Sequence, residues 1–322
     1  MKRILTILLC ICLCAGCMSA CSGGKDAASA GELSVVTTIF PIYDWVREIA
    51  GEKAKITMLL DSGTDLHSYQ PTADDLVKLA TCDLFIYVGG ESDEWTEDAL
   101  GSTSNDTRVA MSLMETLGEN VKEEEVKEGM QAEEEEEEEE AEGPEYDEHV
   151  WLSLRNAATL CRAIADTLSQ IDEENAALYT ANANSYVEKL NALDGEYQAA
   201  VDGAAVKTVL FGDRFPFRYM VDDYGLDYYA AFVGCSAETE ASFETVITLS
   251  QKVDALGLHA ILQIESADGS IAETIRKNTK TQDQKILTLN SLQSVTSQDV
   301  AAGVQYLQVM QDNLTVLKQA LQ

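Results

Sequence analysis

The chain has 322 residues, of which 46% are hydrophobic and 24% are charged, a composition that suits two domains with buried cores rather than a disordered chain. Its 56 Asp and Glu residues outnumber its 22 Lys and Arg residues, which gives a net charge of −34. This charge argues against a nucleic-acid-binding protein, because phosphate contacts need clustered cations, and it is compatible with a protein that collects cations.

The N-terminus has the layout of a lipoprotein signal peptide over residues 1–21. A positive start is followed by an apolar run over 4–13, which is too short to span a bilayer as a mature helix. Cys17 and Cys21 each follow small residues, as the lipidated cysteine of a bacterial lipobox does. We expect Cys21 to carry the lipid, because a small-residue tether over 22–32 follows it. The protein would then be anchored to the outer face of the bacterial cell membrane; secretion without a lipid is the alternative.

The signal peptide contains five of the eight cysteines, so the spacing of Cys14 and Cys17 indicates neither a redox site nor a zinc site. Cys82, Cys161 and Cys235 remain in the mature chain. They are too widely spaced to predict a ligand cluster. Cys161 falls on the apolar stripe of a predicted helix and is expected in the core, and a disulfide among the three stays open.

Strands and helices alternate over residues 33–172 and predict an N-terminal α/β lobe. The strand over 84–88 is apolar throughout, as are strands buried on both faces of a parallel sheet. The other predicted strands are 33–39 and 54–60, and the predicted helices are 44–50, 72–80 and 155–171.

An acidic loop over 119–147 interrupts this pattern, with eight consecutive glutamates at 133–140. A block of like charges repels itself, so we expect the loop to be disordered within the lobe. It would raise the cation concentration nearby without fixing any geometry. Glutamates alone form a weak site that suits hard ions, and a merely solubilising loop is the alternative.

A single long helix is expected over 173–203, where apolar residues recur close to helical spacing. At 1.5 Å per residue it would be about 40 Å long. It has no glycine or proline from Ala176 until Gly195, so we interpret it as a stiff connection rather than a flexible linker.

A C-terminal α/β lobe over 204–322 follows, so the predicted fold class is α/β, with two similar lobes that have central, mainly parallel sheets and are joined by one long rigid helix. Its predicted strands are 206–211, 228–233, 260–264 and 285–289, and its predicted helices are 217–224, 243–256, 271–279 and 300–321.

Histidine is scarce, with only His67, His149 and His259. His67 and His149 both follow the expected ends of structured elements in the first lobe, and ligands of open α/β sheets bind beyond the carboxyl ends of the strands. A lone histidine is most often structural, but two loop histidines in one lobe favour a ligand pair. His259 directly precedes a strand, and we interpret it as structural.

The second lobe places Asp213, Glu265 and Asn290 after three of its predicted strands. Because parallel strands end at the same rim of a sheet, all three are expected to line one cleft. Two imidazoles that face two carboxylates across a cleft would suit Zn²⁺ or Mn²⁺. Asp213 could instead pair with Arg214 or Arg218.

From about residue 33 to 321 the chain resembles the metal-specific solute-binding lipoproteins of bacterial ABC importers (cluster A-I, the zinc and manganese binders). Four stretches carry the resemblance: VVTTIFPIYD at 35–44, HSYQPT at 67–72, DEHVWLS at 147–153 and ENAALY at 174–179.

The resemblance implies one metal ion held in the cleft between the two lobes, with its first two ligands at His67 and His149. The third ligand of the family falls on Gly212, which has no side chain, and the fourth falls on Asn290, a poor neutral ligand. We expect Asp213 and Glu265 to replace them.

The resemblance also implies a monomeric surface lipoprotein that binds Zn²⁺ or Mn²⁺ and passes it to a membrane ABC permease, with no reaction catalysed and no nucleic acid bound. Zinc is the first expectation, because N/O sites generally bind Zn²⁺ more tightly than Mn²⁺. A metal-dependent hydrolase is one alternative, although the chain has no His-Glu-x-x-His run or nucleophile elbow. A surface adhesin of the same family is another.

Overall fold

The computed structural model describes residues 32–102, 105–131, 145–236 and 240–322. The predicted signal peptide, including Cys17 and Cys21, and nearly all of the tether lie outside these ranges. Within them, no helix combines the length and the apolar character that a membrane span requires.

The first sheet of the described chain has four parallel strands in the order β2-β1-β3-β4. In register, Val35 lies opposite both Ile56 and Leu84. The central strands β1 and β3 are almost entirely buried, which explains their runs of apolar residues. The strands are β1 (Leu33–Thr37), β2 (Ala54–Met58), β3 (Leu84–Tyr87) and β4 (Val109–Ser112). The helices of this lobe are α2 (Phe40–Ala50), α3 (Ala73–Thr81), α4 (Trp95–Ser102), α5 (Leu113–Leu117) and α6 (Leu154–Ile171), with short 3₁₀ turns η1 (Gly51–Lys53), η2 (Leu66–Ser68), η3 (Glu91–Asp93), η4 (Gly118–Asn120), η5 (Val150–Leu152) and η6 (Glu173–Asn175).

The second sheet, as far as the structure describes it, is also four-stranded and parallel, in the order β6-β5-β7-β8. Its strands are β5 (Thr208–Phe215), β6 (Asp227–Val233), β7 (Ala260–Ile264) and β8 (Lys285–Leu289). Its helices are α8 (Arg218–Tyr224), α9 (Phe243–Leu256), α10 (Ser270–Asn278), α11 (Ser297–Ala301) and α12 (Tyr306–Ala320). The two similar α/β lobes of the predicted fold class are therefore confirmed.

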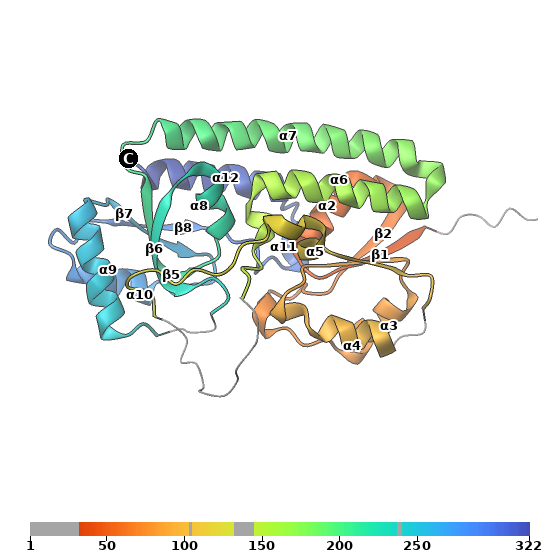
Figure 1. The fold of residues 1–322 in the computed structure, drawn as a ribbon, viewed down its shortest axis with the longest axis horizontal. Coiled ribbons are helices and arrows are strands. Elements are labelled where there is room, and N and C mark those ends of the chain that lie inside the picture. Colours follow the sequence, from red (N-terminus) through yellow and green to blue (C-terminus); the bar gives the residue numbers. More distant parts are fainter. Residues whose placement is uncertain (1–31, 103–104, 132–144, 237–239) are drawn as a thin grey trace, which may run out of the picture. The chain divides into compact units, whose positions relative to one another are not determined.

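Helix α7 (Ala176–Asp202) has 27 residues and packs against α6, α2 and α12, so it contacts helices of both lobes (Figure 1). Its buried residues follow a helical stripe that includes Tyr179, Tyr186, Leu193 and Val201. The long connecting helix expected from the spacing of apolar residues is confirmed.

Several elements differ from the sequence-based expectation: helix α2 begins at Phe40 rather than at residue 44, and helices α4 and α5 are not among the predicted elements. The terminal helix does not run continuously over 300–321, because Gly303 adopts φ 92° and separates α11 from α12. Strand β4 was not expected. Strand β5 extends to Phe215 through an irregular register between Phe211 and Arg214, whereas we expected it to end at Phe211.

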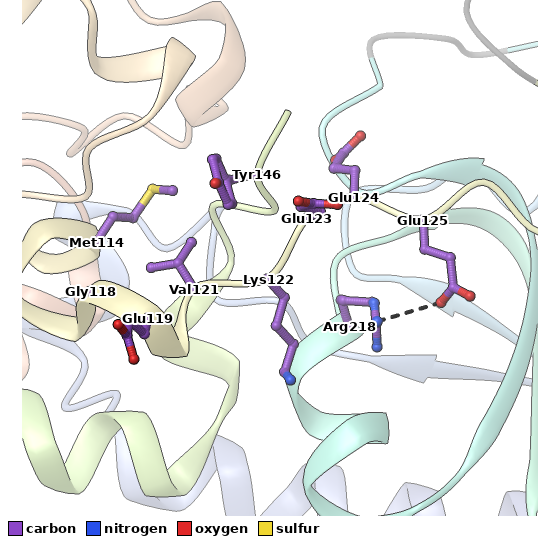
Figure 2. A pocket seen from close by; sticks show the side chains of 10 residues that line it. All are labelled: Met114, Gly118, Glu119, Val121, Lys122, Glu123, Glu124, Glu125, Tyr146 and Arg218. Atoms are coloured by element: carbon purple, nitrogen blue, oxygen red, sulfur yellow. Dashed lines mark ion pairs between the residues drawn. The ribbon is translucent and has the colours of Figure 1, made fainter. Parts of the chain in front are cut away.

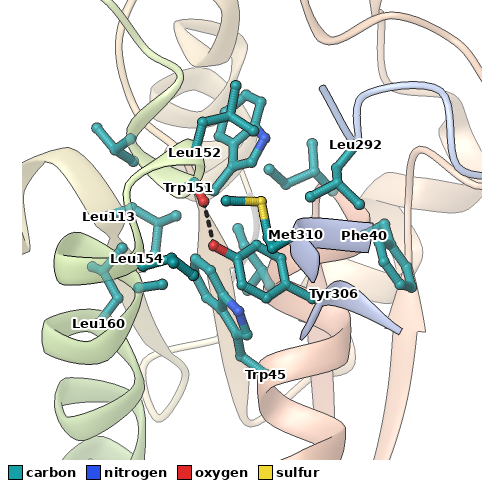
Figure 3. Packing of buried hydrophobic residues seen from close by; sticks show 14 of the residues in the cluster. Phe40, Trp45, Leu113, Trp151, Leu152, Leu154, Leu160, Leu292, Tyr306 and Met310 are labelled. Atoms are coloured by element: carbon teal, nitrogen blue, oxygen red, sulfur yellow. Dashed lines mark hydrogen bonds between the residues drawn. The ribbon is translucent and has the colours of Figure 1, made fainter. Parts of the chain in front are cut away.

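A shared aromatic core joins elements of the two lobes (Figure 3). The Tyr306 hydroxyl donates to the Trp151 carbonyl at 2.6 Å, and the Tyr306 amide donates to the Asp44 carboxylate at 2.8 Å. The Trp151 indole donates to the carbonyl of Ser291 at 2.8 Å. Because these buried bonds link α2 and η5 of the first lobe to α12 and the segment after β8, they restrict the motion of one lobe against the other.

The predicted disorder over 119–147 is wrong for the described residues 119–131 and 145–147. Glu123 and Tyr146 form an antiparallel bridge, and the Glu124 amide donates to the Glu145 carbonyl at 2.9 Å. Further along, Lys127 pairs with Asp227 at 2.6 Å. Backbone pairing and lysine partners therefore order both flanks of the acidic segment, while the eight glutamates at 133–140 lie outside the described residues.

Candidate metal centre

His67 lies in the short turn η2, between strands β2 and β3 of the first sheet. The Asp65 carboxylate caps this turn by accepting the His67 amide at 3.1 Å. The Nδ1 atom of His67 lies 2.7 Å from the Ser92 hydroxyl. The ring orientation is thus fixed from its Nδ1 side, and Nε2 is left to face the interior.

His149 is fully buried at the start of η5. The Asp147 carboxylate accepts the His149 amide at 2.8 Å and lies 3.0 Å from its Nδ1. A carboxylate on the far ring nitrogen is the usual support of a metal-binding histidine, because it fixes the tautomer that leaves Nε2 unprotonated.

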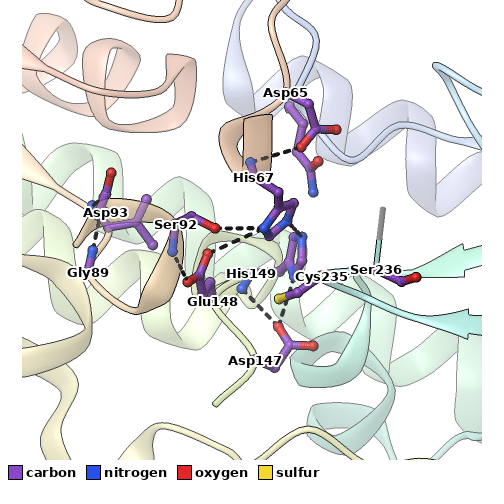
Figure 4. Close-up of polar contacts among 12 residues, drawn as sticks. Asp65, His67, Gly89, Ser92, Asp93, Asp147, Glu148, His149, Cys235 and Ser236 are labelled. Atoms are coloured by element: carbon purple, nitrogen blue, oxygen red, sulfur yellow. Dashed lines mark hydrogen bonds and ion pairs between the residues drawn. The ribbon is translucent and has the colours of Figure 1, made fainter. Parts of the chain in front are cut away.

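The two histidines face one another through their Nε2 atoms, which are 3.3 Å apart (Figure 4). Two nitrogen ligands on a tetrahedral zinc ion, each about 2.0–2.1 Å from the metal, would be about 3.3–3.4 Å apart. The two Nε2 atoms are therefore already spaced as two nitrogen ligands of one zinc ion would be.

Electrostatics keep His67 neutral, because burial, with a smaller contribution from His149, lowers its pKa to about 3. Burial raises the pKa of the neighbouring Glu148 carboxyl to about 7. Its Oε2 atom lies 3.6 Å from His67 Nδ1 and has no hydrogen bond. A neutral imidazole can offer its nitrogen lone pair to a metal, whereas an imidazolium cannot.

A third possible metal ligand, the thiol of Cys235, lies near the two histidines. The sequence alone did not predict this proximity. The Cys235 Sγ and one ring nitrogen of each histidine all lie within 4.8 Å of one another. The expectation that Cys82, Cys161 and Cys235 contribute to no cluster is therefore wrong for Cys235, although it is correct that Cys161 is buried in the core. Cys235 closely follows the end of β6, and the strand-end rule applied to Asp213 would also have found it.

Asp213 lies inside β5 and not after it. Its carboxylate accepts the Arg214 amide at 2.8 Å and the Ile264 amide at 3.0 Å. It lines a cavity of about 360 Å³ together with His67, but it does not join the cluster of His67, His149 and Cys235. Arg214 pairs through its side chain with Asp65 of the first lobe, so the alternative interpretation, in which Asp213 pairs with an arginine side chain, does not describe its contacts.

Glu265 and Asn290 also lie outside the cluster of described ligand atoms. The Glu265 carboxylate accepts the Ser291 amide at 2.6 Å and the Ser291 hydroxyl at 2.9 Å. The Asn290 carbonyl side chain accepts the Leu292 amide at 2.8 Å. Both side chains hold the segment after β8 in place, which explains polar residues at this strand end without a metal.

Gly212 has no room for any side chain. A Cβ atom at this position would lie 2.5 Å from the Ala272 Cα in α10, which is closer than real Cβ atoms come. The position that the family resemblance assigns to the third ligand is therefore used for close packing of β5 against α10.

Acidic side chains line one cavity beside the histidine pair. This cavity has a volume of about 230 Å³, and its lining includes His67, Cys235, Ser92 and Tyr146. Four glutamates complete its wall: Glu91, Glu124, Glu145 and Glu148. The ionised carboxylates among them attract cations toward the histidines and so raise the local cation concentration.

A wider hollow of about 740 Å³ has a mixed charge (Figure 2). Lys122 and Arg218 line it beside Glu123 and Glu125, and Arg218 pairs with Glu125 at 3.5 Å. Because its glutamates share the surface with two cations, it suits a metal ion less well than the cavity beside His67.

The model of the family described as zinc-uptake complex component A, periplasmic, matches residues 35–320 of the chain. The chain is 32% identical to the zinc-binding lipoprotein AdcA of Streptococcus pneumoniae serotype 4 over 99% of its own length, but it spans 61% of the length of that relative. It is 26% identical to the high-affinity zinc uptake system protein ZnuA of Bacillus subtilis, over 99% of this chain and 97% of the relative.

The fold of the chain also matches solved structures of similar proteins. The Zn(II)-bound ZnuA-like domain of Streptococcus pneumoniae AdcA matches with a TM-score of 0.71 and 29% identity, over 90% of this chain and 99% of that one. The metal-dependent lipoprotein YcdH from Bacillus subtilis matches with a TM-score of 0.73 and 25% identity, over 90% of this chain and 99% of that one.

Proposed function

Because the chain belongs to the family of the zinc-uptake complex component A, we propose that it captures a zinc ion outside the cytoplasm and delivers it to the permease of an ABC importer. The observation that carries this proposal is the pair of Nε2 atoms that face one another at 3.3 Å. His67 and His149 hold the ion, and Ser92 and Asp147 orient the two rings from behind.

Capture places the ion beside contacts that join the two lobes. Asp65, which caps the turn of His67, pairs with Arg214 of the second lobe. A bound ion next to this pair adds a further connection between the lobes, and the permease recognises the resulting surface. Ligand-dependent closure of lobes is a common way in which binding proteins signal that they are loaded.

The protein binds its cargo and catalyses no reaction in this proposal. A hydrolytic metal site needs a general base close to the metal-bound water. The unbonded Glu148 oxygen is on the Nδ1 side of His67, whereas the metal would lie on the Nε2 side. The hydrolase and adhesin alternatives gain no support from the contacts of the described residues.

The N-terminal sequence supports a proposal about the location of the protein. We propose that Cys21 is lipidated and anchors the protein, as a monomer, to the outer face of the cell membrane. A relative with 32% identity is named a zinc-binding lipoprotein, which supports this placement. The tether over 22–32 would let the lobes reach a permease in the same membrane.

Native mass spectrometry on the chain without its predicted signal peptide tests the function. After chelation, re-added Zn²⁺ is expected to bind as one ion per chain and to outcompete Mn²⁺. The double variant His67→Ala/His149→Ala is expected to lose the ion, and the exposed His259→Ala is the matched control that retains it. Stoichiometric zinc in the double variant, or none in the wild type, would contradict the proposal.

A further inference from the structure

The Cys235 thiol lies where a third zinc ligand is needed. Its Sγ and one ring nitrogen of each histidine are all within 4.8 Å of one another (Figure 4). In a tetrahedral site with a Zn–S bond of about 2.3 Å and Zn–N bonds of about 2.0–2.1 Å, the sulfur and each nitrogen are about 3.6 Å apart. A contraction of about 1 Å therefore suffices to place all three atoms around one ion.

The backbone at Gly234, just before Cys235, lies close to the imidazole ring of His149. A Cβ atom at Gly234 would lie 3.1 Å from both Cε1 and Nδ1 of His149, and 2.9 Å from the Phe215 carbonyl. A residue with a side chain at this position would push the imidazole away from Asp147. Glycine thus permits the close approach that brings Cys235 beside His149.

Contacts from both lobes hold this turn in place. The Cys235 amide donates to Glu124 Oε1 at 3.2 Å, and Glu124 belongs to the segment that pairs with Glu145. The next residue, Ser236, accepts a bond from the Arg214 guanidinium at 3.5 Å through its carbonyl. These two side chains hold the main chain of residues 235 and 236, and with it the position of the thiol.

The position of Cys235 also compensates for the missing ligand at Gly212. Strands β5 and β6 are neighbours in the sheet, and Phe215 pairs in register with Val233 near their carboxyl ends. A ligand that cannot be accommodated on β5, where Gly212 packs against α10, can thus be supplied from the end of the adjacent strand.

We propose that Cys235 supplies the third zinc ligand of this site as a thiolate, beside His67 and His149. The inference rests on the proposed function, because it needs zinc at the histidine pair. When the Zn–S bond forms, the S–H bond breaks and its proton passes to water. A fourth position stays open for water or a carboxylate, unlike the closed four-ligand shell of a structural zinc site, and this suits an ion that must be released.

A thiolate ligand also affects which metal is bound. Thiolate favours Zn²⁺ over Mn²⁺, which prefers oxygen ligands such as carboxylates. Cys235 would therefore supply a preference for Zn²⁺ over Mn²⁺, which Gly212, having no side chain, cannot supply. Removal of the thiolate is expected to lower the zinc affinity more than the manganese affinity.

Cobalt substitution tests the ligand directly. With Co²⁺ in place of zinc, the wild type is expected to show a sulfur-to-cobalt charge-transfer band in the near ultraviolet, and Cys235→Ser is expected to lose it. Cys82→Ser is the matched control, because Cys82 is also a free, largely buried cysteine, and it should keep the band. In zinc competition titrations, Cys235→Ser is expected to bind at least about tenfold more weakly.

The outcomes separate this inference from the proposed function. If the wild type binds one zinc ion that the double histidine variant loses, but Cys235→Ser keeps full affinity and the cobalt form shows no sulfur band, the third ligand is wrong and the function stands. If the wild type binds no zinc, the proposed function fails, and the inference fails with it. Unfolding midpoints of the metal-free variants check that Cys235→Ser remains folded.

Discussion

At the scale of single residues, two polar side chains orient the imidazole rings of His67 and His149 by contacting their Nδ1 atoms. Ser92 lies 2.7 Å from the Nδ1 of His67, and Asp147 lies 3.0 Å from that of His149. With Nδ1 engaged on each imidazole, Nε2 is the atom left for a metal. Each histidine and the side chain that supports it therefore form one hydrogen-bonded unit.

Replacement of Asp147 by asparagine should weaken zinc binding by about 10–100-fold, because an amide supports the His149 tautomer and its basicity less well than a carboxylate. Isothermal titration calorimetry with a competing chelator measures the change. Asp106→Asn, an exposed acid, is the control that should bind zinc like the wild type. Equal affinities of the Asp147 and Asp106 variants would show that Asp147 does not support the ligand.

Buried Asp44 gives the protein a pH-dependent stability away from the metal site. Burial raises the pKa of its carboxyl to about 6, although the Tyr306 amide and Arg47 act in the opposite direction. Because the folded protein binds this proton more tightly than the unfolded chain does, the stabilisation is complete below about pH 4 and is lost as the pH rises through about 6.

Asp44→Asn should abolish the loss of stability between pH 4 and pH 7, because asparagine does not ionise. Its side-chain oxygen can still accept the Tyr306 amide. Relative to the wild type, the variant should gain up to about 3 kcal/mol in unfolding free energy between pH 4 and pH 7, as the raised pKa implies. Urea unfolding at the two pH values measures it. The same difference between variant and wild type at both pH values would be inconsistent with a raised pKa.

At the scale of elements, the sequence was sufficient where apolar periodicity was strong. The spacing of apolar residues predicted α7, and the fully apolar run at 84–88 predicted β3. It could not predict that β5 continues past Gly212, because continuation depends on packing against β6 and α10. That one error placed Asp213 at a strand end, whereas it lies within β5 and outside the cluster of His67, His149 and Cys235.

The acidic segment and Cys235 escaped prediction for a related reason. Local charge repulsion predicts disorder, but Lys127 with Asp227 and Lys252 with Glu128 supply partners from distant parts of the chain. Similarly, Cys235 meets His67 only through tertiary contacts between segments more than a hundred residues apart. Long-range pairing of this kind leaves no periodic signal in a single sequence.

The packing of β5 on α10 gives a test at this scale. Gly212→His would put a metal-binding side chain where the family resemblance places the third ligand, yet it should not add a ligand, because its Cβ would lie 2.5 Å from Ala272 Cα. We expect about 1–3 kcal/mol of destabilisation and no gain in zinc affinity.

Gly195→His is the matched control, since a Cβ at Gly195 in α7 meets nothing within 4 Å. Denaturant unfolding and zinc titration of both variants measure the effects. Tighter zinc binding by Gly212→His would show that β5 can move away from α10 and that the third ligand belongs on this strand.

At the scale of the whole molecule, buried bonds between the lobes limit how far they can move. Tyr306 bonds to both Asp44 and Trp151, and α7 packs against helices from each lobe. Opening the lobes widely would expose these buried aromatic and polar groups, at a cost of several hydrogen bonds and much apolar area. Zinc binding is therefore expected to involve a small local closure.

Small-angle X-ray scattering of the metal-free and zinc-loaded protein measures this closure. The radius of gyration should agree between the two forms within experimental error, while zinc raises the unfolding temperature through its affinity for the folded state. A clear decrease in the radius on zinc binding would indicate a wide hinge motion and would contradict the restriction by the shared core.

The zinc-edge X-ray absorption spectrum of the one-zinc protein tests the central claim most directly, because it reports which atoms surround the ion. We predict one sulfur at about 2.3 Å and nitrogen ligands at about 2.0–2.1 Å, with the outer-shell signature of two imidazoles from His67 and His149. The sulfur should be absent from the spectrum of Cys235→Ser. A shell of oxygen and nitrogen atoms alone in the wild type, without sulfur or paired imidazoles, would contradict the site.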